Sequence, residues 1–145
     1  MDPKPIVVER LLNADVATVW KAITDRDEMA KWYFDLAEFQ ARVGFTFQFT
    51  AGDPAKPYVH YCKITEVVPE KKLSYTWRFE GDPGVSLVSF GLFKQGDQTR
   101  IVLTHTGVET FSPDDPALDR MNFVGGWEQI IAVNLKSYLE GGKVS

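Results

Sequence analysis

Residues 115–142 read DPALDRMNFVGGWEQIIAVNLKSYLEGG and form the longest periodic stretch of the chain. Across residues 116–140 the apolar side chains recur at intervals of three and four, which is the period of an amphipathic helix. These are Met121, Phe123, Val124, Trp127, Ile130, Ile131, Leu135, Tyr138 and Leu139. Asp115 is a suitable N-cap, Pro116 suits the first helical position, and the glycine pair at 141–142 supplies a stop. Such a helix spans roughly 37 Å, so we expect the rest of the chain to cover its apolar stripe.

Two more glycines, Gly125 and Gly126, lie inside this helix just before Trp127. Each costs about 1 kcal/mol relative to alanine in a helix interior, so something should offset the loss. Either the helix backbone approaches the sheet closely there, or space is left free beside Trp127. Close packing is the favoured interpretation.

Between residues 36 and 106 the apolar period changes to two, which is typical of strands with one dry and one wet face. Phenylalanines alternate with polar residues in 45–49, and apolar residues alternate with polar ones in 73–79. The series continues, with turn residues between the runs, in 58–67, 86–94 and 99–106. Short connections of this kind imply antiparallel neighbours.

Residues 6–12 are rich in β-branched side chains and predict a first strand, which two short helices follow. Asp15 is placed to cap the first helix, and Asp25 with Glu28 has the spacing of a capping box for the second. The element order therefore predicts an α+β fold, in which a curved antiparallel sheet wraps around the long C-terminal helix. No repeat or linker divides the chain, so we expect a single domain over residues 1–145.

The composition excludes several classes of partner. The chain has 145 residues, a net charge of −4 and a pI near 5.2, and its basic residues are scattered. This argues against a nucleic-acid partner, because phosphate binding needs clustered lysine and arginine. Cys62 is the only cysteine, which rules out an intrachain disulfide and suits a reducing compartment. The first residues lack a long apolar run, so we expect neither a signal peptide nor a membrane span, and a cytoplasmic location.

Five motifs occur in a distinctive order: the helix with Trp20, MAKWY at 29–33, LSYTW at 73–77, TRIVLTHTG at 99–107, and Gly126-Trp127 with Leu135 behind it. In this order they resemble the SRPBCC (START/Bet v1-like) superfamily. Within it they are similar to the branch of the C-terminal domain of the activator of Hsp90 ATPase. The likeness covers nearly the whole chain.

This resemblance implies a helix-grip fold, with about seven antiparallel strands around the C-terminal helix and two small helices closing one end. It also implies that the gap between sheet and helix can be a cavity for lipids, sterols, polyketides or other hydrophobic ligands. Gly44 stands alone where the branch often has two glycines, so the nearby turn can differ. We expect no additional N-terminal domain of the kind that the eukaryotic activators carry, which weakens the expectation of an Hsp90-type chaperone as partner.

If the strand alternation holds, one aromatic-rich wall faces the helix and is the candidate ligand-binding site. Its members are Phe47, Phe49, His60, Tyr75, Trp77, Phe90, Leu92, Leu103 and His105 on the strands, and Phe123, Trp127 and Ile131 on the helix. A mostly apolar lining with a few polar groups is typical of a ligand site, and equally of a filled core. Spacing alone favours plain packing, and the resemblance brings the two interpretations close to even.

The only histidines, His60 and His105, are both in phase with apolar neighbours. Either can orient a ligand or exchange a proton near neutral pH. No carboxylate stands at an obvious pairing distance, so structural imidazoles are favoured and we predict no catalytic residue. One cysteine and two separated histidines do not form a usual zinc cluster. No phosphate-binding glycine motif or G-x-S-x-G elbow is present, so we expect no metal and no cofactor.

Three functions stay open at this point. The leading hypothesis is a module that binds a small hydrophobic or amphipathic molecule between sheet and helix. The second is a chaperone-associated or self-associating module, such as a homodimer, with a filled core and an exposed apolar patch that includes Tyr33, Phe34 or Phe39. The third, an enzyme acting on a hydrophobic substrate, requires a polar dyad inside the cavity.

Overall fold

The computed structural model describes residues 4–34, 36, 38–53, 56–112, 118 and 120–140. Its strands are β1 (Ile6–Leu12), β2 (Thr46–Asp53), β3 (Lys56–Val68), β4 (Lys72–Phe79), β5 (Ser86–Gln95) and β6 (Gln98–Thr106). They form one sheet in the order β1-β6-β5-β4-β3-β2, and every neighbouring pair is antiparallel. The predicted α+β architecture is confirmed. The described part of the sheet has six strands, one fewer than the roughly seven that the family resemblance implies.

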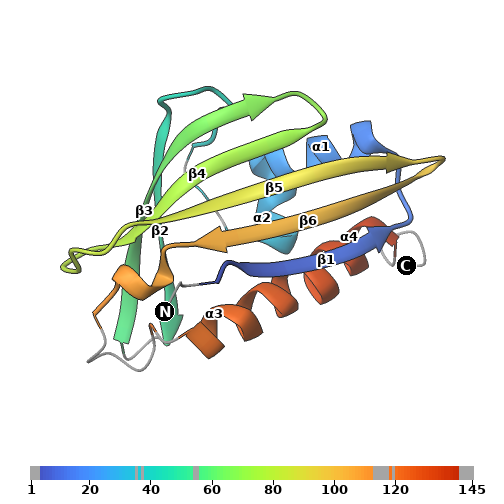
Figure 1. The fold of residues 1–145 in the computed structure, drawn as a ribbon. Helices are drawn as coiled ribbons and strands as arrows, with labels where there is room; N and C mark the ends of the chain where they lie inside the picture. Colours follow the sequence, from blue (N-terminus) through green and yellow to red (C-terminus); the bar gives the residue numbers. More distant parts are fainter. Residues whose placement is uncertain are drawn as a thin grey trace.

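The helices gather on one side of the curved sheet (Figure 1). Two short helices, α1 (Val16–Thr24) and α2 (Arg26–Trp32), follow β1 as predicted. The C-terminal helix runs along β1 and consists of α3 (Arg120–Trp127), a π-helical segment η3 (Glu128–Leu135) and α4 (Lys136–Glu140). A single 3₁₀ turn, η1 (Val108–Thr110), follows β6. The core therefore lies between the concave face of the sheet and these helices.

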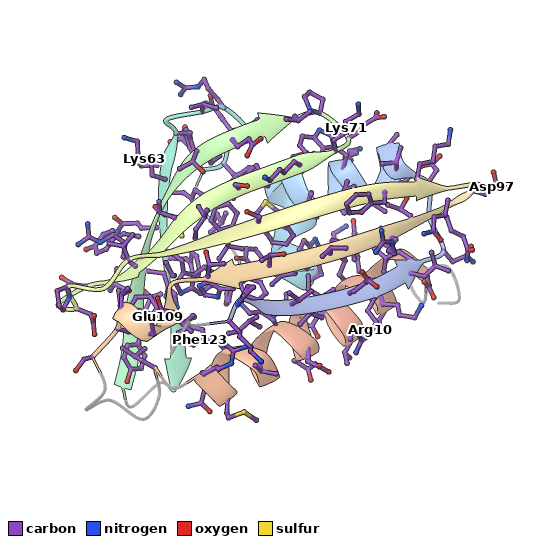
Figure 2. The ribbon with its side chains drawn as sticks, in the orientation of Figure 1. Arg10, Lys63, Lys71, Asp97, Glu109 and Phe123 are labelled. Atoms are coloured by element: carbon purple, nitrogen blue, oxygen red, sulfur yellow. The ribbon has the colours of Figure 1, made fainter. Side chains whose placement is uncertain are left out.

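Polar contacts attach the C-terminal helix to β1. The Lys136 ammonium group donates to the carbonyl oxygen of Leu11 at 3.2 Å, and Arg10 forms an ion pair with Glu128 at 3.4 Å. Arg10 extends from the edge strand beside the helix in Figure 2. These exposed contacts add little energy each, but they fix the helix alongside the edge of the sheet.

The buried side of the C-terminal helix differs from the predicted stripe. Its buried residues in the described range are Trp127, Ile131, Leu135 and Leu139, all four apart, while Met121 is 69% exposed. In an ideal α-helix a step of four residues turns about 40° past a full circle, so three steps would rotate the stripe by about 120°. The i→i+5 hydrogen bonds of a π-helix wind the chain more loosely, and η3 thereby keeps the four side chains facing the sheet.

Close packing at Gly125 and Gly126 is the wrong interpretation. Both glycines are exposed, and a Cβ atom added to either would meet nothing within 4 Å. The pair lies on the solvent side, directly before Trp127 and η3. Glycine pairs tolerate changes of helix geometry, so the pair is well placed at the transition from α-helix to π-helix.

The helix caps match the sequence in part. Asp15 accepts a hydrogen bond from the amide of Thr18 at 2.9 Å, and Asp25 caps α2 by accepting from the amides of Asp27 and Glu28. Glu28 does not complete a capping box, because its carboxylate accepts from the hydroxyl of Tyr138 at 3.0 Å. The expected cap at Asp115 and Pro116 and the stop at 141–142 lie outside the described residues.

The convex face of the sheet carries exposed apolar side chains, namely Val7, Leu11, Leu87 and Phe93. The Phe93 ring lies over Gly91, and the Arg100 guanidinium stacks on it at 4.6 Å from the ring centroid. No helix within the described ranges is long and apolar enough to cross a membrane.

Candidate functional site

Pairing in register brings the predicted site residues onto the concave face. Phe49 lies opposite His60, His60 lies opposite Phe79, and Trp77 lies opposite Ser86. Of the predicted residues, Phe123 is half-buried, and the buried ones are Phe47, Phe49, His60, Tyr75, Trp77, Phe90, Leu92, Leu103, His105, Trp127 and Ile131. The alternation of each strand therefore predicted the facing correctly.

Trp77 is the centre of an aromatic enclosure. Its ring centroid lies 5.0 Å from that of His60, 5.4 Å from Trp127, 5.6 Å from Phe49 and 5.8 Å from His105. Aromatic pairs at such separations are in contact and stabilise each other through their edges and faces. Strands β2, β3, β4 and β6 and the C-terminal helix thus each contribute one side chain to the same place.

Phe123 closes the enclosure from α3. In Figure 2 it lies between the C-terminal helix and the sheet. Its ring is 5.2 Å from His105 and 6.1 Å from Phe79. Phe111, which follows η1, stacks on it at 5.7 Å. Because Phe123 is only half-buried, this side of the enclosure is close to solvent.

A second group of predicted residues continues the wall toward the middle of the sheet. The Tyr75 ring contacts Phe47 at 5.1 Å and Phe90 at 5.9 Å, and Phe90 contacts Trp127 at 6.1 Å. The remaining predicted residues are aliphatic members of the same buried core: Leu92, Leu103 and Ile131.

His105 lies in a continuous hydrogen-bond chain. The Trp127 indole Nε1 donates to Nδ1 of His105 at 2.8 Å, and Nε2 of His105 is 2.7 Å from the Ser86 hydroxyl oxygen. That hydroxyl donates to the carbonyl oxygen of Trp77 at 2.8 Å. An indole nitrogen only donates and a carbonyl only accepts, so Nε2 of His105 must bear the proton. Burial lowers the pKa of His105 to about 3, which keeps the ring neutral.

The hydrogen bond between Ser86 and His105 runs in the direction opposite to the one that nucleophilic catalysis requires. A general base must take the proton of the hydroxyl, but Nε2 of His105 donates to it and Nδ1 is occupied by Trp127. The required polar dyad is therefore not found at this pair. Ser86 was missed in the sequence, although it is in phase with Val88 and Phe90 and so could have been placed on the inner face.

His60 is also neutral. Nδ1 lies 2.9 Å from the carbonyl oxygen of Tyr58, so Nδ1 bears the proton. Burial lowers the pKa of His60 to about 4, although hydrogen bonds to the backbone of Tyr58 and Phe49 act in the opposite direction. Its ring stacks on Phe49 at 4.5 Å.

Trp77 bears an unpaired donor in the middle of these rings. Its Nε1 is buried and is the one buried side-chain nitrogen or oxygen among the described residues that lacks a hydrogen-bond partner. Leaving a buried N–H without an acceptor costs about 1–3 kcal/mol. Such groups are rare in native proteins and call for an explanation.

Tyr33 and Phe34 face the enclosure rather than forming the expected exposed patch. Tyr33 stacks on Trp127 at 6.2 Å, and Phe34 stacks on Phe49 at 4.3 Å. Both are half-buried, and Phe39 is buried. The patch expected under the second hypothesis is therefore absent at these three residues. They follow α2 without a regular period, so no local pattern indicated their direction.

A metal site is not apparent. No three His, Cys, Asp or Glu side chains in the described part of the chain lie together as metal ligands would. The residues of the enclosure are mostly aromatic, and Nε1 of Trp77 among them has no hydrogen-bond partner. The arrangement suits contact with an apolar molecule that bears a hydrogen-bonding group.

A curved antiparallel sheet around a C-terminal helix, with two short helices after the first strand, defines an SRPBCC-type helix-grip protein. Residues 13–140 match the family of activator of Hsp90 ATPase homolog 1-like proteins, and the chain belongs to this family. The expectation from the sequence motifs is thus confirmed. No curated protein matches the chain.

Solved structures share the fold over nearly the whole chain. Protein MLL2253 from Mesorhizobium loti is 28% identical, with a TM-score of 0.79 over 95% of this chain and 98% of its own. The Aha1 dimer from Colwellia psychrerythraea is 22% identical, with a TM-score of 0.73 over 97% and 99%. A protein from the dynemicin biosynthetic locus is 23% identical, with a TM-score of 0.78 over 97% of this chain. The present chain spans about half, 49%, of that protein's length.

Proposed function

We propose that the protein binds a small hydrophobic or amphipathic molecule between the concave face of the sheet and the C-terminal helix. The buried, unpaired Nε1 of Trp77 is the observation on which this proposal rests. A plain core would place an apolar ring there, or would supply an acceptor. A bound molecule with an acceptor atom gives this N–H its partner.

The surrounding rings would supply the contact area. Phe49, His60, Trp127 and Phe123 surround Trp77 from different elements, and large aromatic side chains bury much apolar surface. The half-buried rings of Tyr33, Phe34 and Phe123 would form the entrance, since they lie on the enclosure and still reach solvent. The fold supports this role, because the C-terminal helix lies against the concave face of the sheet that carries these rings.

The chemistry of the site favours binding over catalysis. Both nitrogens of His105 are occupied, and His60 is neutral. A general acid or base needs a pKa near the working pH, and burial lowers the pKa values of His60 and His105 to about 4 and about 3. The proposed role of the two histidines is therefore orientation of neighbouring groups.

Native mass spectrometry of the protein as purified tests this proposal. We expect an added mass that is released on acid denaturation, and we expect the Trp77→Phe variant to retain less of it. Trp32→Phe is the matched control, because the indole of Trp32 already donates to the carbonyl oxygen of Ala22 at 2.9 Å. An unliganded mass for all three proteins, together with no uptake from a panel of apolar compounds, would refute the proposal.

Self-association through the convex face is a second candidate function. Val7, Leu11, Leu87 and Phe93 are exposed there, and a groove of about 950 Å³ lies between Phe93 and the turn from β3 to β4. One protein of the same fold is described as a dimer. Sedimentation equilibrium tests this: a dimer that Phe93→Lys dissociates supports it, and a monomer at every concentration contradicts it.

A further inference from the structure

Tyr33, which is half-buried, and the buried Tyr75 form a hydroxyl pair in which only one of the two hydroxyl hydrogens is shared. Their oxygens are 2.6 Å apart. Each phenol has one O–H, and only one of the two hydrogens can lie between the oxygens. Neither hydroxyl has another hydrogen bond among the described residues. Burial raises both pKa values well above the ordinary range, so both phenols stay protonated and one O–H has no acceptor among the described residues.

This spare donor and Trp77 belong to the same enclosure. Tyr75 and Trp77 are two residues apart on β4, so their side chains point to the same face about 7 Å from each other. Phe49 contacts both Tyr33, at 6.2 Å, and Trp77, at 5.6 Å. Trp127 also contacts both, at 6.2 Å and 5.4 Å. One flat molecule held by these rings would meet both donors.

The enclosure contains no charge that would accept an anion. The buried polar residues in the described ranges are His60, Ser74, Ser86, Thr99 and His105, without a lysine or an arginine. Both histidines are neutral, because burial lowers the pKa of each ring. A carboxylate would enter without a counter-charge, which is unfavourable in an apolar surrounding.

From these three observations, and resting on the proposed function, we infer that the ligand is a neutral, flat, apolar carbonyl compound. One carbonyl oxygen accepts the hydrogen bond of Nε1 of Trp77. A second acceptor oxygen, about 7 Å away, takes the spare hydroxyl of the Tyr33 and Tyr75 pair. Unpaired donors in the site therefore select ligands with acceptor oxygens over plain hydrocarbons and over acids.

A matched series of small bicyclic compounds tests this selection. The full chain, labelled with ¹⁵N in its indoles, is titrated at pH 7.5 with 1-indanone, indane or indane-1-carboxylate. The ketone should bind about five- to tenfold more tightly than indane, because it adds one neutral hydrogen bond. It should also move the Trp77 indole N–H resonance downfield. The carboxylate should bind at least about tenfold more weakly than the ketone.

Variants show which donor is responsible. Trp77→Phe should remove the preference for the ketone over indane while indane still binds. Trp32→Phe should keep the preference, because its N–H is bonded to Ala22 outside the enclosure. If Trp77→Phe does not fold, the wild-type resonance shift still decides the question.

The outcomes distinguish a failure of the carbonyl inference from a failure of the proposed ligand binding. Equal affinity for ketone and hydrocarbon, with no shift of the Trp77 resonance, would overturn the carbonyl inference and leave ligand binding intact. Tightest binding of the carboxylate would overturn the neutrality of the ligand. Failure of all three compounds to bind at millimolar concentration would overturn both the inference and the proposed function.

Discussion

Trp127 donates from Nε1 to Nδ1 of His105 at 2.8 Å, so one hydrogen bond joins the C-terminal helix to β6 in the interior. The bond fixes the His105 tautomer and aligns the Trp127 ring beside Trp77 at 5.4 Å. Buried polar contacts of this kind favour one arrangement of a core, because alternatives leave a donor or acceptor unpaired. The position of the aromatic wall thus depends on this link.

The link predicts a loss of stability in acid. The pKa values of His105 and His60, about 3 and about 4 in the folded protein, lie below the ordinary 6.5. Because the unfolded chain binds these protons first, stability is full above about pH 6.5 and falls toward pH 4, by up to about 1.4 kcal/mol per pH unit for each histidine. Urea unfolding of the wild type and His105→Gln between pH 7 and pH 4.5 measures this. If the free energy of unfolding fell equally steeply with pH in the two proteins, the prediction would be contradicted.

Removing the Ser86 hydroxyl should destabilise the fold. Ser86→Ala leaves Nε2–H of His105 and the carbonyl of Trp77 without their partner, at a cost of about 1–3 kcal/mol in the free energy of unfolding. Thr106→Ala is the control, because Thr106 is exposed at the end of β6, and its loss should cost under about 1 kcal/mol. Equal effects in chemical denaturation would show that the Ser86 bond to His105 is unimportant.

Alanine at the exposed glycines should stabilise the helix. Gly125→Ala and Gly126→Ala add a Cβ that meets no atom within 4 Å, and each should raise the unfolding free energy by about 0.5–1 kcal/mol. Thermal melts monitored by circular dichroism measure this. A lower melting temperature in both variants would mean that the helix approaches another element there.

Cys62 should be unreactive in the folded protein. It is 3% exposed, and burial raises the pKa of its thiol far above the ordinary value. Only the thiolate reacts quickly, so a disulfide reagent at pH 8 should label Cys62 only after denaturant is added. Complete labelling within seconds without denaturant would contradict the burial of this side chain.

Local periodicity accounts for most of the fold and for much of the site. Alternation on the strands placed Phe49, His60 and Trp77 on one face, and the helix period placed Trp127 opposite them. The π-helical turn of η3 has no such signal, because it depends on which side chains the sheet buries. The seventh strand came from the family resemblance and is absent among the described residues.

Hydrogen-bond partners depend on tertiary distances and could not be predicted. The pairs Ser86 with His105 and Tyr33 with Tyr75 join residues 19 and 42 positions apart. Whether Nε1 of Trp77 has a hydrogen-bond acceptor depends on every side chain and backbone group around it. Sequence spacing names the residue that faces inward, and only the assembled core shows whether its polar atom has a partner.

A high-resolution crystal structure of the protein as purified tests the central claim most directly. We predict density of a non-protein molecule against Trp127 and Phe49, with an acceptor atom at about 2.8–3.2 Å from Nε1 of Trp77. A Trp77 indole that donates to a protein carbonyl, or a map without non-protein density beside these rings, would contradict the account.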